Sequence, residues 1–386
     1  MNECSKILTL YPLQKRDYSR HPLLIKAIND KSFKINIFDL SNILKFRKNH
    51  FYNESMPPKN AVNISYIKVN SLIYLINLIP KKDYSCLFRV PKIFTKTREF
   101  IILFIIAFLF KNLIFYDLNP SPEFLLFNKN YKNFIKQKFA FLKEKSKFYY
   151  YSKYFAFILL KFFSDIIHKQ LKYKNVFVSG AILEEYYKSF NVNVKITRTA
   201  SFDYKKFKDH KYYVSQEKKF PINNNCKNLY YIDGGHINHK DQEYFNKKQD
   251  CDEDSWEKLL NSLFNLYAKE GYKITIFKHP NLNSDFYKRQ NVNIKSNIYD
   301  LLTKKENNDL IICSSGTLSI LIPFFNYDFI FLFDESITKS KLNTEVIVLK
   351  KLFPKNTFIK NEITELFNPS KINNESLNNL KDFFLE

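Results

Sequence analysis

Residues 227–334 alternate short apolar runs with amphipathic segments, and this alternation constrains the fold more than any other feature of the chain. Four runs have the length of buried strands: NLYYID, KITIFKHP, DLIICSS and FIFLFD. Strands that alternate with helices build a parallel sheet in an α/β protein. The sequence therefore predicts a Rossmann-like domain of order β-α-β-α-β-α-β over residues 226–368.

The clearest helix signal in this domain is DSWEKLLNSLFNLYAKEG. Its apolar residues recur at helical spacing, which predicts one buried face: Trp256, Leu259, Leu260, Leu263, Phe264 and Tyr267. Asp254 is the expected N-cap, and Gly271 the expected stop. IYDLLTKK and TLSILIPFF predict two shorter helices.

Residues 1–218 carry a similar alternation and predict a first Rossmann-like domain. The expected strands are KILTLYP, FKINIFDL, NVFVSG and VKITRT, and the expected helices HPLLIKAIND and AILEEYYKSF. A basic and aromatic region around 120–172 has the periodicity of one or two long amphipathic helices. The polar stretch 215–228 is the expected boundary between the domains, and 369–386 is expected to form a tail helix that packs back on the body.

Composition narrows the class of protein. The formal net charge is +23, and the chain has 40 Phe and 26 Tyr. Part of this bias matches an AT-rich coding sequence, but the remaining charge favours anionic neighbours such as nucleotide phosphates or anionic lipids. No nucleic-acid-binding motif appears, and the charge is spread along the chain, so nucleic acid is not an expected partner. Five scattered cysteines without a CxxC pair indicate a reducing compartment and no zinc knuckle.

One segment, residues 100–118, resembles a membrane span. Its uninterrupted apolar run, Phe100–Phe110, has eleven residues, whereas a spanning helix needs about 20. We expect a buried helix that leads into the strand LIFYD, with an interfacial element as the alternative. The N-terminus lacks the basic start and apolar core of a signal peptide. These features predict a cytoplasmic protein, attached peripherally and electrostatically to the anionic inner membrane face, which high salt would release.

Three short motifs follow successive strands of the second domain. They are Asp233-Gly234-Gly235, His279-Pro280 and Ser314-Ser315-Gly316-Thr317. Taken singly they match an ordinary turn, a strand stop and a helix N-cap. Taken together they all fall at the carboxyl ends of parallel strands, the edge where open α/β sheets bind ligands. The chain has only five glycines, and two of them stand side by side here, where the backbone must turn sharply or approach a ligand closely.

The residue types in these motifs suit a phosphate-bearing donor. A helix that opens at Gly316-Thr317 offers free amides and a positive dipole end to a phosphate, and Ser314 and Ser315 add hydroxyl donors. His279 can donate to a phosphate oxygen, with Lys278 beside it.

The first motif suits an acceptor. Asp233 is the natural general base for an acceptor hydroxyl. His236 and His239 are candidates for positioning acceptor or donor. A metal site built from Asp233, His236 and His239 is an alternative reading of the same residues, but the motifs are explained without a metal, so none is expected.

These residues resemble bacterial GT-B glycosyltransferases of surface polysaccharide assembly, most closely the sialyltransferase and Kdo-transferase groups that use CMP-activated sugars. The resemblance implies two Rossmann-like domains facing a cleft. It assigns Asp233 as catalytic base, and His279 of the His279-Pro280 pair as a catalytic residue that contacts the donor phosphate and assists the leaving group. It assigns Ser314 and Ser315 to phosphate binding. The sequence departs from the pattern at Ile232, where such enzymes often carry an acid.

A second resemblance covers the segment DGGHINHKD. It is similar to a pattern in other bacterial polysaccharide proteins that places Asp233, His239 and Asp241. The segment QKRDYSRHPLL echoes the first loop of the same proteins, and there Arg16, Asp17 and Arg20 would face the cleft.

The expected function is transfer of a sugar, such as a nonulosonic acid, from a CMP-linked co-substrate to a glycan or glycolipid acceptor of capsule, lipooligosaccharide or O-chain. No further cofactor is expected. Two alternatives stay open at this point: a polyol-phosphate transferase of the teichoic-acid type, and a non-catalytic paralogue, which Ile232 suggests.

Overall fold

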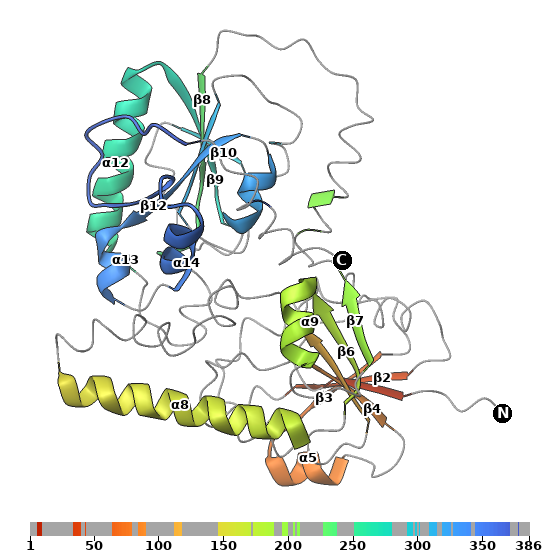
Figure 1. The fold of residues 1–386 in the computed structure, drawn as a ribbon. Coiled ribbons are helices and arrows are strands. Elements are labelled where there is room, and N and C mark those ends of the chain that lie inside the picture. The colour runs from red at the N-terminus through yellow and green to blue at the C-terminus, as the bar shows by residue number, and fades with distance from the viewer. Residues whose placement is uncertain are drawn as a thin grey trace, which may run out of the picture. The chain divides into compact units, whose positions relative to one another are not determined.

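The computed structural model contains two compact units, each built on a parallel sheet (Figure 1). It describes residues 6–9, 34–39, 43, 64–78, 84–89, 112–117, 146–170, 173–188, 195–199, 204, 207–208, 227–237, 251–279, 292–295, 298, 301, 309–314, 319–325, 327–340, 344–370 and 377. Unit 1 comprises Met1–Leu118 and Phe155–Thr199, and unit 2 comprises Asn119–Tyr154 and Ala200–Leu385. The predicted bounds, 1–218 and 226–368, differ from this division at residues 119–154 and 200–218. The α/β class is confirmed, whereas the facing of the two domains across a cleft stays a prediction.

Unit 1 holds a seven-stranded sheet in the order β3-β2-β1-β4-β5-β6-β7, with every neighbouring pair parallel. Its strands are β1 Lys6–Thr9, β2 Lys34–Asp39, β3 Ile64–Lys68, β4 Tyr84–Arg89, β5 Asn112–Asp117, β6 Tyr173–Ser179 and β7 Lys195–Thr199. The helices are α5 Leu72–Leu78, α8 Lys147–Gln170, which crosses from unit 2 into unit 1 between Tyr154 and Phe155, and α9 Gly180–Lys188. All five expected strands of this half, LIFYD included, are confirmed, and β3, β4 and α5 were not predicted. The expected helix HPLLIKAIND lies outside the described residues.

Unit 2 holds a six-stranded parallel sheet in the order β10-β9-β8-β11-β12-β13. Its strands are β8 Lys227–Ile232, β9 Tyr272–Phe277, β10 Asn293–Lys295, β11 Leu310–Cys313, β12 Asp328–Asp334 and β13 Thr357–Lys360. The helices are α12 Glu253–Lys269, the 3₁₀ helix η3 Ser319–Phe325, α13 Glu335–Ser340 and α14 Thr344–Leu352. The four expected strands are confirmed, and β10 and β13 extend the sheet at its two edges.

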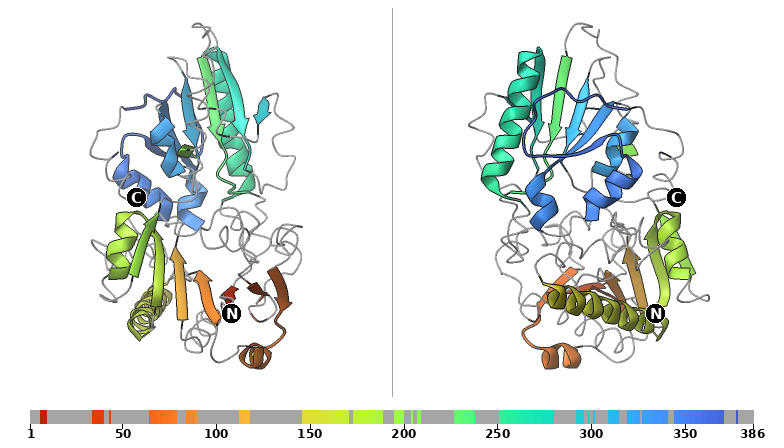
Figure 2. Two further views of the ribbon diagram at one scale, coloured as in Figure 1. Left: turned by 90° about the vertical axis from the view of Figure 1, so that its right-hand side faces the viewer. Right: turned by 60° about the vertical axis from the view of Figure 1, so that its left-hand side comes forward.

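Both sheets follow one winding rule. Numbered within its own unit, each sheet begins 3-2-1-4-5-6, the doubly wound order in which the direction of winding reverses between strands 1 and 4. Because parallel crossovers are right-handed, helices before and after that reversal cover opposite faces. In unit 2, α12 connects β8 to β9 and η3 connects β11 to β12, and they lie on opposite sides of the sheet (Figure 2).

Helix α12 supplies one side of the unit 2 core. The six residues that its periodicity marked as one face are all buried. The predicted N-cap, Asp254, is wrong. Asp252 caps the helix, because its Oδ1 accepts a hydrogen bond of 2.9 Å from the backbone N–H of Ser255. At the other end Gly271 has φ +82°, the left-handed conformation that stops a helix, which confirms the predicted stop.

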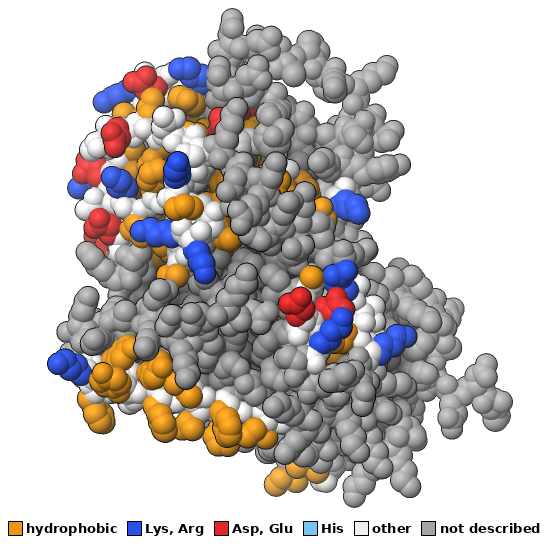
Figure 3. Space-filling model, viewed as in Figure 1, with side chains coloured by type: hydrophobic (Ala, Val, Ile, Leu, Met, Phe, Trp, Pro, Cys, Tyr) orange, Lys and Arg blue, Asp and Glu red, His pale blue; other side chains and the backbone are white. Residues whose placement is uncertain are grey.

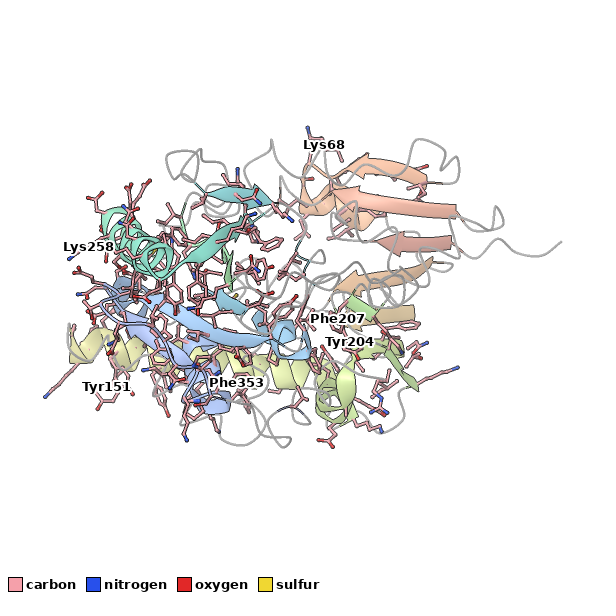
Figure 4. All side chains as sticks on the ribbon, turned by 90° about the horizontal axis from the view of Figure 1, so that it is seen from above. Lys68, Tyr151, Tyr204, Phe207, Lys258 and Phe353 are labelled. Atoms are coloured by element: carbon pink, nitrogen blue, oxygen red, sulfur yellow. The ribbon has the colours of Figure 1, made fainter. Side chains whose placement is uncertain are left out.

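The opposite face is closed by an aromatic cluster around η3. Pro323 lies inside this element, which is a 3₁₀ helix where the sequence predicted a helix of unspecified type. Tyr204 and Phe207 lie together beside it (Figure 4), with the ring centroids of Phe207 and Phe325 5.0 Å apart and those of Tyr204 and Phe324 5.8 Å apart. Tyr204 and Phe207 are thereby packed against η3 of unit 2.

The chain after β13 packs back on α12. The backbone N–H of Ile363 donates to Ser262 Oγ at 2.8 Å, and that of Phe367 donates to the Tyr267 hydroxyl at 3.1 Å. Phe367 also stacks near Phe358 of β13, with centroids 4.7 Å apart. Of the expected tail helix 369–386, all but residues 369, 370 and 377 lies outside the described residues.

The apolar segment 100–118 is described only from residue 112 onward. There LIFYD lies in β5, as predicted, whereas the expected buried helix before it lies outside the described residues. Among the helices that the structure describes, none combines the length and the apolar character required to cross a bilayer.

Candidate functional site

The three motifs of the sequence meet at one edge of the unit 2 sheet. In the strand register, Ile232 at the end of β8 pairs with Phe277 at the end of β9 and with Cys313 at the end of β11. Asp233, Lys278 and Ser314 are therefore the first residues beyond three adjacent strands. The reversal of winding lies between β8 and β11, and the crevice outside the strand ends at this switch point is where open α/β sheets bind ligands.

Backbone hydrogen bonds between neighbouring segments continue for one residue beyond the ends of the strands. The N–H of Asp233 donates to the carbonyl of Phe277 at 3.1 Å, and the N–H of Ser314 donates to the carbonyl of Ile232 at 3.2 Å. These bonds fix the backbone of the first and third motifs to their neighbours.

A side chain then links the first and third motifs directly. The N–H of Gly234 donates a hydrogen bond of 2.6 Å to Ser314 Oγ. Ser314 is fully buried. The sequence predicted that this hydroxyl would bind a donor phosphate; the structure places it in the floor of the site, holding the loop after β8.

The paired glycines now have a physical explanation. Asp233 Oδ1 accepts a hydrogen bond of 2.9 Å from the N–H of Gly235, which closes a tight turn on the carboxylate. Gly235 has φ +72°, a conformation that favours glycine. Gly234 brings its amide against Ser314. One glycine lets the chain turn, and the other lies where that turn meets β11.

Asp233 is held in place by its own turn. Only 5% of the residue is exposed. With Oδ1 engaged by Gly235, the carboxylate has a fixed orientation at the switch point. That is the arrangement a general base needs, since its proton acceptor must be positioned before its basicity matters.

Tyr231 was not identified from the sequence and belongs to the same cluster. Its side chain is fully buried. Burial and the charge of Asp233 raise the pKa of Tyr231 well above its usual value of 10.0, while the Ser314 hydroxyl acts in the opposite direction. The sequence could have identified Tyr231, because residues i and i+2 of a strand share a face and Tyr231 therefore lies on the same side as Asp233.

His236 lies deeper than its predicted role implies. It is 3% exposed, and its ring packs edge-on against Trp256 of α12 at 5.2 Å and lies 6.4 Å from Phe333 of β12. This position makes it a support that fastens the loop after β8 to the core. His239, the other histidine of that loop, lies outside the described residues.

The second motif follows β9. The N–H of Lys278 donates to the carbonyl of Lys295 in β10 at 3.0 Å, so this residue continues the sheet toward its edge. Lys278 and His279 are both half-buried, at the level of the strand ends where a ligand would lie. Pro280, Ser315, Gly316 and Thr317 lie outside the described residues, so the predicted phosphate-binding helix start stays a prediction.

A metal centre was the alternative reading of the first motif. Within the parts of the chain that the structure describes, no group of three or more His, Cys, Asp or Glu side chains is placed to hold a metal ion. Of the three residues considered, His236 packs against Trp256, and His239 is not among those described.

Comparison with known proteins adds a set of distant structural neighbours. No family profile matches the sequence, and no curated protein matches it. A solved structure described as a UDP-N-acetylglucosamine 2-epimerase from Listeria monocytogenes is 10% identical, with a TM-score of 0.41 over 98% of this chain and 86% of that one. A UGT transferase from Siraitia grosvenorii in complex with UDP is 7% identical, with a TM-score of 0.46 over 90% of this chain and 84% of that one.

A third neighbour is a 2,6-sialyltransferase from Photobacterium in complex with CMP and lactose. It is 12% identical, with a TM-score of 0.44 over 92% of this chain and 78% of that one. The three neighbours include an epimerase and transferases that differ in their nucleotide, so this likeness selects no single activity for the chain.

Proposed function

We propose that this protein is a glycosyltransferase of the GT-B type that uses a CMP-activated sugar. One observation carries the proposal: the hydrogen bond from Gly234 to Ser314 Oγ joins the acid-glycine motif to the serine motif at the switch point of a doubly wound sheet. The His279 motif follows the neighbouring strand. The three motifs that suggested the family thus follow three adjacent strands of one sheet.

Each group has a role in the proposed reaction. Asp233 takes the proton from an acceptor hydroxyl, whose oxygen forms a bond to the anomeric carbon of the donor sugar. The bond from that carbon to the phosphate oxygen breaks, and CMP departs. His279 donates a hydrogen bond to the phosphate and stabilises the charge that develops on it. The segment that begins with Ser315, Gly316 and Thr317 supplies amides and hydroxyls to the same phosphate.

Ser314 takes a different role in this scheme from the one first assigned to it. Because its hydroxyl oxygen accepts from Gly234 and the residue is fully buried, it positions the Asp233 loop. We therefore assign direct phosphate contact to Ser315 and to the residues after it.

The setting that we propose is the cytoplasmic face of the bacterial inner membrane, where capsule, lipooligosaccharide or O-chain acceptors are extended. A sugar of the nonulosonic type is the proposed cargo. The donor carries a single phosphate, which hydroxyls and a helix start can hold without a metal, so we propose metal-independent transfer.

The test is a thermal-shift titration with CMP, CDP, UMP and UDP, each in EDTA and in magnesium. A ligand that binds the native state raises its stability according to its affinity, so equal concentrations rank the affinities. CMP should give the largest shift, with or without magnesium. A larger shift with CDP would favour the polyol-phosphate transferase, and a requirement for magnesium-bound diphosphate would overturn the CMP assignment. No shift with any nucleotide would favour the non-catalytic paralogue.

A further inference from the structure

Helix α8 presents an unusual row of exposed apolar side chains. They are Phe148 at 85% exposure, Tyr149 at 47%, Tyr151 at 58%, Phe155 at 62%, Leu159 at 38%, Phe162 at 58% and Phe163 at 51%. Apart from Tyr149, their positions recur at intervals of three, four and seven, so they form one face of the helix. We call this face the α8 stripe. Figure 3 shows hydrophobic side chains in a row along the helix.

The α8 stripe is long and mostly aromatic. From Phe148 to Phe163 the helix rises roughly 22 Å, since each residue adds about 1.5 Å. Single exposed apolar residues are normal on a protein surface, but a long row of them marks a surface that contacts an apolar partner. The α8 stripe therefore calls for a partner with an apolar surface.

The charged residues in the sequence before and within α8 indicate the chemistry of that partner. The sequence that leads into the helix, residues 129–147, has seven lysines and a single glutamate, and the whole chain carries +23. α8 itself contains four lysines and one aspartate. Basic residues beside a face rich in Phe, Tyr and Leu are the composition of a helix that lies in the interface of an anionic bilayer.

We infer that α8 is a membrane-surface helix, and that the α8 stripe enters the headgroup region of an anionic bilayer while the lysines of α8 meet the lipid phosphates. This extends the peripheral association proposed above and names the element responsible. It also changes the expected mode of attachment. Salt screens the lysine contacts but not the apolar contact, so high salt should weaken binding without abolishing it.

The test is vesicle co-sedimentation of the full chain without nucleotide. The triple variant Phe148→Gln, Phe155→Gln, Phe162→Gln removes three well-exposed members of the stripe and leaves every charge in place. The control variant Ile294→Gln, Leu366→Gln removes apolar residues of 40% and 41% exposure that lie on other elements. Vesicles of phosphatidylcholine mixed with phosphatidylglycerol are compared with vesicles of phosphatidylcholine alone, at low and high salt.

The wild-type chain and the control should bind the mixed vesicles, more weakly at high salt, and the triple variant should bind on the order of 100-fold more weakly. Equal binding by the triple variant and the wild type would overturn the inference, as would no binding by the wild type. A wild-type dimer that the triple variant converts to a monomer, with no vesicle binding by either, would show instead that a second copy covers the stripe. Because no donor is present, either failure leaves the proposed glycosyl transfer untouched. Circular dichroism confirms that each variant is folded.

Discussion

The backbone N–H of Gly234 donates a hydrogen bond of 2.6 Å to the hydroxyl oxygen of Ser314, 80 residues later in the chain. This bond spans the point where the winding of the second sheet reverses. It makes the serine part of the support beneath the Asp233 loop.

Replacing Ser314 tests that role. Ser314→Ala leaves the Gly234 amide without its acceptor in a buried position, so the free energy of unfolding should fall by about 1–3 kcal/mol. Activity should fall as well, because the Asp233 loop loses its anchor. Urea unfolding gives the first quantity, and Ser152→Ala, at an exposed position of α8, is the matched control. An unchanged midpoint for Ser314→Ala would contradict the anchoring role.

Replacing Asp233 separates catalysis from folding. An asparagine at this position keeps an Oδ1 that accepts from Gly235, so the turn should persist. The maximal rate should fall by roughly 10²–10⁴-fold, the usual contribution of a general base, with nucleotide affinity nearly intact. Initial-rate kinetics and a nucleotide titration measure the two effects. Loss of nucleotide binding before loss of rate would assign Asp233 to the donor site.

His279→Ala tests the proposed phosphate contact. Turnover should fall by about 10²–10³-fold, as when one transition-state donor is lost, and the fold should persist. Lys273→Ala changes an exposed residue of β9, the strand that His279 follows, and should keep wild-type turnover. If His279→Ala is folded and fully active, His279 is not part of the site.

The two acids at the start of α12 should differ in their contributions. Asp252 caps the helix through Ser255, whereas Asp254 lies within the first turn. Asp252→Ala should lower the free energy of unfolding by about 1 kcal/mol, and Asp254→Ala by only a few tenths of a kcal/mol through the helix dipole. Equal losses in chemical denaturation would contradict the assignment of the cap to Asp252.

The raised pKa of Tyr267 predicts that the protein loses stability at alkaline pH. Burial raises the pKa of its hydroxyl from 10.0 to about 12. As pH rises above 10.0, the unfolded chain releases this proton while the folded chain keeps it, so the free energy of unfolding falls until the pH passes about 12.

The measurement is urea unfolding at about pH 9 and about pH 11, values on either side of the ordinary tyrosine pKa. Tyr267→Phe removes the ionisation and should lose less stability between these two conditions than the wild type does. A parallel loss in both proteins would show that Tyr267 does not cause the decline.

The periodic parts of the fold were predictable, and the local signals explain why. The buried face of α12 and the apolar cores of β8, β9, β11 and β12 follow from residues close in sequence. β10 and β13 were missed because NIK has a single apolar residue and TFIK has two, whereas all four residues of the equally short β11, LIIC, are apolar.

Features that depend on contacts between residues distant in sequence were not predictable. Three consecutive acids stand at the start of α12: Asp252 is the N-cap, and Glu253 and Asp254 lie in the first turn. The position of Asp252 is fixed by a distant residue, because its N–H donates to Ser336 Oγ at 3.0 Å. The sequence likewise placed the site motifs at the correct strand ends, but the burial of Ser314, His236 and Tyr231 depends on packing between β8, β11 and α12. The proposed catalytic roles of Asp233 and His279 stay predictions.

The strand order of the second sheet also determines when each strand can pair during synthesis. β8 is made first, yet it ends in the centre of the sheet, between β9 and β11. Until the ribosome has delivered Leu310–Cys313, one side of β8 is an open edge of unpaired amides and carbonyls flanked by buried aromatic residues. A nascent chain that stops between β9 and β11 therefore has an unpaired strand edge that can pair with another chain. Slow translation of residues 278–309 would prolong this state and so favour aggregation.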